Sequence, residues 1–146
     1  MQDVTNALTN LHTRLIDSAD GYAQALDSVE SHTHAEIFRE MKTRRERNAA
    51  ELRTYLADRG VSLDDDGSIL AAAHRAFLQL KSTLGSDDAA VLEEVIRGEE
   101  TLLEAYNDAI EPAGAQTPEL DFLTKQYQWL SQKVEDLKSL RRSAAA

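Results

Sequence analysis

The sequence contains no cysteine, only two prolines and six glycines, and few aromatic residues. The absence of cysteine excludes disulfide bonds and thiolate chemistry. The scarcity of proline and glycine leaves long stretches free of residues that interrupt helices. No apolar run approaches the roughly 18 residues needed to span a bilayer, and residues 1–4 do not resemble the start of a signal peptide. We therefore expect a soluble, cytoplasmic protein.

Positive charge is also scarce, because 16 Lys and Arg residues stand against 26 Asp and Glu, which gives a net charge of −10 over 146 residues. This balance argues against nucleic acid as a partner, since phosphate binding draws on clustered positive charge. One basic stretch, residues 42–47, is expected to be a solvated helix face, where Glu40 can pair with Arg44 one turn later. Its flanks are too weakly basic for membrane binding.

Apolar residues recur at steps of three and four through most of the chain, which is the pattern of amphipathic helices. Start and stop signals bound these helices: a capping box formed by Thr33 and Glu36, a left-handed helix end at Gly60, a stop at Pro112, and a start at Thr117-Pro118. The pattern predicts helices over about residues 3–29, 33–60, 68–84, 86–111 and 117–140.

Four long helices and one short one, joined by mostly brief loops, indicate an all-α four-helix bundle. The short helix over 68–84 is expected in the connection between the two hairpins. We predict one domain over residues 1–142, followed by a disordered tail over 143–146. Asp64-Asp65-Asp66 is expected to be a solvated acidic turn, because a calcium loop needs alternating acids and a Glu at its twelfth position, which is Arg75 here.

Three polar residues interrupt the apolar seams and form the candidate site. Glu99 lies at the centre of the seam over 86–111, while Arg45 and Asn48 lie in the middle of the second helix. A buried carboxylate needs a partner, so we predict a buried Arg45–Glu99 ion pair with Asn48 beside it. Its role is expected to be structural registry rather than catalysis. The alternative is that Arg45 extends outward along its methylene stem while Glu99 faces a hydrated groove.

The last helix has an apolar arc that is wider than one seam. Phe122 and Trp129 lie seven residues apart on its flank, which either the helix over 68–84 or another subunit covers. Homo-oligomerisation through this helix is therefore a hypothesis. Gly98, beside Glu99, either lets a neighbouring helix approach closely or has no structural role.

A bundle of this kind invites comparison with di-metal carboxylate proteins, which need Glu-x-x-His pairs on two helices. The sequence contains no Glu-x-x-His. A single-metal site that combines Glu99 with His12, His34 or His74 stays open as an alternative, although His74 alone is expected to be a packing residue. No nucleophile motif or glycine-rich phosphate loop is present, so we expect neither an enzyme nor a bound cofactor.

Several short stretches, in their order and spacing, resemble a bacterial family of ferritin-like four-helix-bundle proteins known mainly as a domain of unknown function. The resemblance covers roughly residues 5–111. It is carried by Arg45 with Ala49-Ala50-Glu51-Leu52, by Ala73-His74-Arg75 with Leu80-Lys81, and by Leu92-Glu93-Glu94 with Arg97-Gly98-Glu99.

The resemblance implies a ferritin-like bundle, but the iron ligands of that superfamily are missing here, so ferroxidase activity and iron storage are not expected. The leading hypothesis is a non-catalytic structural or interaction protein, stress-associated by family analogy, that associates with itself or with another protein. The alternative is a metal-binding or redox protein with an atypical site around Glu99.

Overall fold

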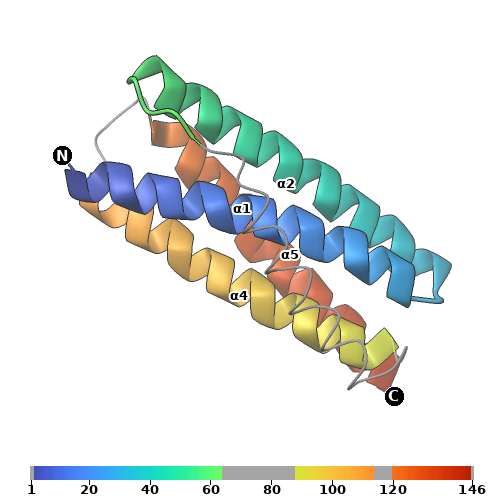
Figure 1. Ribbon diagram of the computed structural model, residues 1–146. Coiled ribbons are helices and arrows are strands. Elements are labelled where there is room, and N and C mark those ends of the chain that lie inside the picture. Colours follow the sequence, from blue (N-terminus) through green and yellow to red (C-terminus); the bar gives the residue numbers. More distant parts are fainter. Residues whose placement is uncertain (1, 64–87, 114–119, 146) are drawn as a thin grey trace.

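The computed structural model describes residues 2–63, 88–113 and 120–145, and these ranges contain four α-helices and no strand. They are α1 (Gln2–Ser28), α2 (His32–Asp58), α4 (Asp88–Ala113) and α5 (Asp121–Ala145) (Figure 1). The four long predicted helices and the all-α class are confirmed. The predicted helix over 68–84, the acidic turn over 64–66, His74 and the start signal at 117–118 lie outside the described residues.

The four helices form a bundle in which α1 packs against α2 and α4, and α4 also packs against α5. Figure 1 shows that α2 and α4 run in one direction while α1 and α5 run in the other. Long side chains connect α2 with α5, as where Lys133 Nζ lies 3.4 Å from Glu40 Oε1. Because α1 lies beside both α2 and α4, and α5 lies beside both as well, α2 and α4 face each other diagonally across the bundle.

None of the four helices has both the length and the apolar character of a membrane span.

The predicted seams form the core. Each helix contributes fully buried aliphatic side chains, among them Leu11, Leu52, Leu92 and Leu130, which have no exposed surface. Burying one such side chain contributes roughly 1.5–3 kcal/mol relative to leaving it in water. The helices are thus held together mainly by the apolar stripes that the three-four spacing places on one face of each.

The start of α2 differs from the predicted capping box. Ser31, rather than Thr33, is the N-cap residue, and its hydroxyl accepts a hydrogen bond from the backbone N–H of His34 at 3.3 Å. The helix therefore begins at His32. Serine is as good a cap as threonine, and the choice between them depends on where the preceding turn ends.

Asp88, at the beginning of α4, ties the α1–α2 turn to the second half of the bundle. Its carboxylate accepts hydrogen bonds from the backbone N–H groups of Glu30 and Ser31, both at 3.1 Å, and lies 3.0 Å from Nδ1 of His34. Although burial acts to raise the pKa of the Asp88 carboxyl, these backbone and histidine contacts lower it overall. An acid that sequence suggests only as a first-turn residue of its own helix thus binds the turn of another.

The helix ends differ from prediction by a few residues. Gly60 has a φ of 78°, which confirms the left-handed conformation predicted after α2. The helix α4 continues through Pro112 to Ala113, one residue beyond the predicted stop. The helix α5 continues to Ala145. It therefore extends past the end predicted near residue 140 and into the stretch over 143–146 that was predicted to be a disordered tail. Alanine favours helix extension, and Arg141 anchors this end to Glu93 of α4 at 2.8 Å.

The exposed Gly98 predicts a stabilising substitution. A Cβ at this position would meet no atom of the described residues within 4 Å, so close approach of α1, α2 or α5 does not explain the glycine. Gly98→Ala should raise the free energy of unfolding by about 0.5–1 kcal/mol, because alanine is the better helix former. Urea denaturation measures the change. Gly60→Ala is the matched control and should destabilise, because Gly60 has a positive φ; a destabilising Gly98→Ala would show that the position has a role in packing.

The Asp88 contacts predict a pH-dependent effect. Asp88→Asn should lower the free energy of unfolding at pH 7 by about 1–3 kcal/mol, because hydrogen bonds to a charged acceptor are lost. The folded-state pKa of this carboxyl is lowered, so its contribution is present at neutral pH and is lost as pH falls below the unfolded value of about 3.9 and through the folded pKa. Urea denaturation at pH 7 and near pH 2 should show the difference from wild type disappear. An equal difference at both pH values would contradict this, and exposed Asp108→Asn is the control.

Candidate functional site

The centre of the bundle contains a buried ion pair between α2 and α4. Arg45 Nη2 donates a hydrogen bond to Glu99 Oε2 at 2.5 Å, and the two side chains are 0 % and 2 % exposed. The structure therefore brings together the two residues that the sequence singled out, and Arg45 does not extend to the surface. A charge-assisted contact between a guanidinium and a carboxylate is among the stronger hydrogen bonds in proteins.

Two residues of α1 complete the surroundings of the carboxylate. Ser18 Oγ donates a long hydrogen bond to Glu99 Oε1 at 3.4 Å. One turn later, the ring of Tyr22 lies with its centroid 5.9 Å from the guanidinium carbon of Arg45. We call Ser18, Tyr22, Arg45, Asn48 and Glu99 the polar cluster. The sequence pattern identified neither Ser18 nor Tyr22 as a member of this cluster.

The electrostatics of the polar cluster follow from its burial. Burial raises the pKa of the Glu99 carboxyl, and the positive charge of Arg45 is the largest effect in the opposite direction. Burial also raises the pKa of the Tyr22 hydroxyl, and the charge of Glu99 adds to this rise. Tyr22 is therefore a neutral hydroxyl at physiological pH, and the cluster contains one cation and one carboxylate that neutralise each other.

Asn48 lies one turn beyond Arg45 on α2 and is 4 % exposed. Its amide nitrogen makes no hydrogen bond within the described residues, so the structure places Asn48 at the ion pair's level of the core without bonding it to Glu99. Burial raises the pKa of the Tyr106 hydroxyl of α4, and the nearby Asn48 side chain acts in the opposite direction.

A second set of polar residues links Tyr106 to the surface. The Tyr106 hydroxyl donates to Gln126 Oε1 of α5 at 2.6 Å, and Gln126 Nε2 donates to Glu51 Oε1 of α2 at 2.7 Å. Gln126 is buried and Glu51 is exposed. Gln126 was not among the candidate residues predicted from the sequence. The signal was present, because Gln126 lies three residues after Leu123 and four before Leu130.

Phe122 and Trp129 lie between α5 and α2. Phe122 packs against Tyr55 with a centroid separation of 5.8 Å, and the guanidinium carbon of Arg44 lies 4.3 Å from the centre of the Trp129 ring. Lys133 Nζ lies 5.3 Å from the same ring. Both aromatic residues stay partly exposed. The flank that was expected to need the helix over 68–84 or another subunit is thus partly covered by α2.

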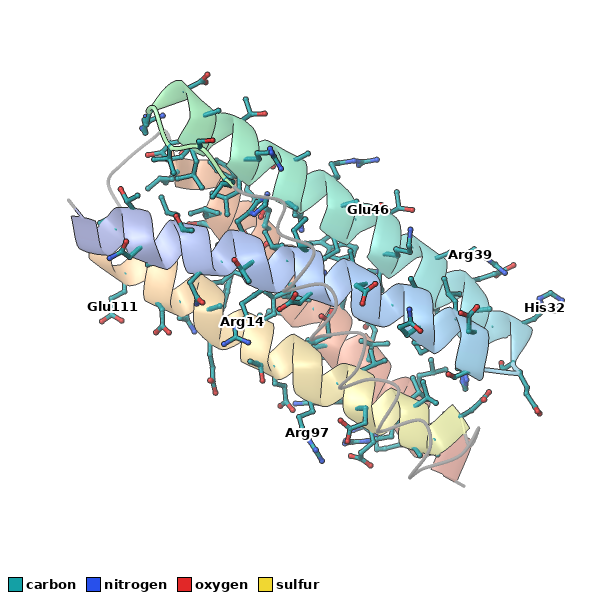
Figure 2. The ribbon with its side chains drawn as sticks, viewed as in Figure 1. Arg14, His32, Arg39, Glu46, Arg97 and Glu111 are labelled. Atoms are coloured by element: carbon teal, nitrogen blue, oxygen red, sulfur yellow. The ribbon has the colours of Figure 1, made fainter. Side chains whose placement is uncertain are left out.

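The basic stretch on α2 divides between the interior and the solvent. Lys42 pairs with Glu46 at 3.3 Å, and Glu46 points away from the bundle like Arg39 on the same helix (Figure 2). Glu40 pairs with Lys133 rather than with Arg44, because Arg44 lies over the Trp129 ring. The solvated face is confirmed, but the predicted partner of Arg44 is wrong.

The histidines that the structure describes do not assemble around Glu99. His34 is held by Asp88 at the end of the bundle, and His12 is buried in α1. Within residues 2–63, 88–113 and 120–145, no group of three or more His, Cys, Asp or Glu side chains could hold a metal ion. Chemically, the Glu99 carboxylate is committed to Arg45, and its 2 % exposure leaves a substrate little access to it.

Comparison with known proteins gives one match. A family model described as "Domain of unknown function (DUF2383)" matches residues 3–112, which includes α1, α2 and nearly all of α4. No curated protein and no solved structure matches the chain. The matched range contains Arg45, Asn48 and Glu99 but ends before α5.

The buried ion pair predicts a large loss of stability when one partner is neutralised. Glu99→Gln should lower the free energy of unfolding by about 3–5 kcal/mol, because it leaves a buried guanidinium without its counter-charge. Urea denaturation at pH 7 measures the loss. The control is Glu46→Gln on the exposed face of α2, which should change stability by less than about 0.5 kcal/mol.

The double variant Arg45→Met/Glu99→Leu distinguishes the effect of losing the ion pair from the effect of leaving one charge buried alone. It should be more stable than Glu99→Gln, because removing both charges leaves neither one buried alone. A near-neutral Glu99→Gln, or a double variant that loses the sum of the single losses, would contradict the assignment of a tightly coupled pair.

Proposed function

This chain belongs to the DUF2383 family, and we propose that it is a non-catalytic helical scaffold that acts by binding protein surfaces, with a second copy of itself as its first partner. The observation that carries the proposal is the Arg45–Glu99 contact at 2.5 Å. A catalytic acid or metal ligand must be reached by its substrate or ion, whereas this carboxylate is enclosed and engaged by a guanidinium. The role of this carboxylate is therefore to hold α4 against α2 through Arg45.

The distribution of charge supports an interaction surface on α2 and α5. The helix α4 carries eight carboxylates and a single arginine, whereas α5 carries five cationic side chains and three carboxylates. Lys138 and Arg141 of α5 pair with Glu100 and Glu93 of α4. Arg44, Arg59 and Lys133 instead lie beside aromatic rings of α2 and α5. An acidic surface, such as the α4 side of a second copy, is the complement of this side.

The aromatic residues on the same side support a contact surface. We call Tyr55, Phe122 and Trp129, with the cations Arg44, Arg59 and Lys133 beside them, the α2–α5 flank. The guanidinium carbon of Arg59 lies 3.7 Å from the centre of the Tyr55 ring, as Arg44 lies over Trp129. Tyrosine, tryptophan and arginine are enriched at protein interfaces, and tryptophan and arginine are frequent among the residues that dominate binding energy.

Two measurements on one sample, purified without chelator, test the proposal. Light scattering after size exclusion at micromolar concentration should give a mass above the 16.2 kDa of one chain, because the flank buries its aromatic rings between copies. Trp129→Ala should return the mass to that of one chain, while the exposed neighbour Gln128→Ala should not. Elemental analysis should find only traces of iron, manganese and zinc.

Each part of the proposal has its own contrary result. A wild-type mass near 16.2 kDa would overturn self-association. Near-stoichiometric metal in the wild type that disappears in Glu99→Gln would replace the scaffold by a metal-binding or redox protein with its site at Glu99.

A further inference from the structure

Arg45 has more hydrogen-bond donors than its neighbours satisfy. A guanidinium carries five N–H groups, and here Nη2 contacts Glu99, while Nε and Nη1 are buried and make no hydrogen bond within the described residues. The amide nitrogen of Asn48 and the hydroxyl of Tyr22 are also buried without a hydrogen bond of good geometry, although Tyr22 lies close to Glu99 and Arg45, and Asn48 lies close to Tyr106. These four atoms all belong to the polar cluster.

The other buried atoms without a partner belong to a different surface. They are Oδ1 of Asp17 and Oδ2 of Asp20. At about 100° per residue, these two positions lie on the side of α1 opposite to Ser18 and Tyr22. Their carboxylates therefore cannot serve the donors of Arg45 and Asn48.

Donors left unpaired in a protein interior are energetically costly, and the cost is larger for charged groups. In folded proteins such groups are paired with protein or with ordered water, which typically makes about three hydrogen bonds. Three of the four atoms here are donors only, because nitrogen in a guanidinium or amide group does not accept. The missing partner is therefore an acceptor.

The charge of the polar cluster identifies which acceptor fits. Arg45 and Glu99 neutralise each other, so an added anion would leave a net negative charge in the core, and burying such a charge is very unfavourable. A cation would be repelled by the N–H groups of Arg45 and Asn48, which cannot act as its ligands. A neutral acceptor that can also donate suits all four atoms, because the Tyr22 hydroxyl can accept as well as donate.

We propose that the polar cluster is a binding site for internal water, with at least one ordered molecule that accepts hydrogen bonds from Arg45 and Asn48 and donates to the Tyr22 hydroxyl. The site is closed, because Arg45, Asn48 and Tyr22 are all less than 5 % exposed. Water in it exchanges only when the bundle opens locally. The buried pair is thereby solvated by a fixed molecule rather than by bulk solvent.

Magnetic relaxation dispersion of water ¹⁷O and ²H on the native protein tests the proposal, because it counts water molecules that stay bound longer than the protein takes to tumble. The wild type should show at least one such molecule. Asn48→Leu, which removes a donor and fills space with apolar atoms, should show fewer. The exposed control Gln128→Leu should equal the wild type.

A second variant keeps the test decisive if Asn48→Leu does not fold. Tyr22→Phe removes a single hydroxyl and should shorten the residence time of the bound water. A wild type without a long-lived water, or variants identical to it, would overturn the proposal. Thermal stability that rises with chloride, against a matched salt of a non-binding anion, and only when Asn48 is present, would instead assign the site to an anion.

Discussion

The ion pair between Arg45 and Glu99 joins α2 and α4, two helices whose backbones approach each other closely at few places. The helices α2 and α4 lie on a diagonal of the bundle, while their apolar contacts are made with α1 and, for α4, with α5. A contact of 2.5 Å across this diagonal fixes how far the first hairpin can slide along the second. Apolar side chains pack acceptably at more than one register, whereas a guanidinium and a carboxylate that miss each other are both left charged in the core.

The energetic cost of burying Arg45, Asn48 and Glu99 is confined to the middle of the bundle. Along α2, the residues on either side of Arg45 and Asn48 are apolar and fully buried, with Phe38 and Met41 before them and Leu52 and Leu56 after them. The two apolar ends supply the free energy of folding, and the polar centre supplies specificity. Hydration of the centre fits this division, because a bound water satisfies donors without adding charge.

The sequence predicted the parts of this structure that depend on helical periodicity. Glu99 and Arg45 were identified because each interrupts a stripe in which a charged side chain is costly, and opposite charges at similar heights predict a pair. Gln126, Ser18 and Asp88 were not identified, since their partners lie on other helices and at distances that no single-helix pattern specifies. The capping residue of α2 was misplaced for a related reason: Ser31 and Thr33 have equivalent chemistry, and the contact of the turn with Asp88 helps to decide where the helix begins.

The enclosed pair also bears on where the chain can act. Glu99 and Arg45 are committed to each other, and His34 is held by Asp88, so these buried groups are engaged within the bundle. Under the function that we propose, selectivity comes from the surface, where cations and aromatic rings lie on the α2–α5 flank and most side chains of α4 that carry charge are carboxylates. A bundle with separated charge associates most favourably when unlike sides meet, and such a contact repeats from copy to copy unless its symmetry closes it. In the function that we propose, the geometry of that contact, rather than a reaction centre, is the property that selection of a partner would depend on.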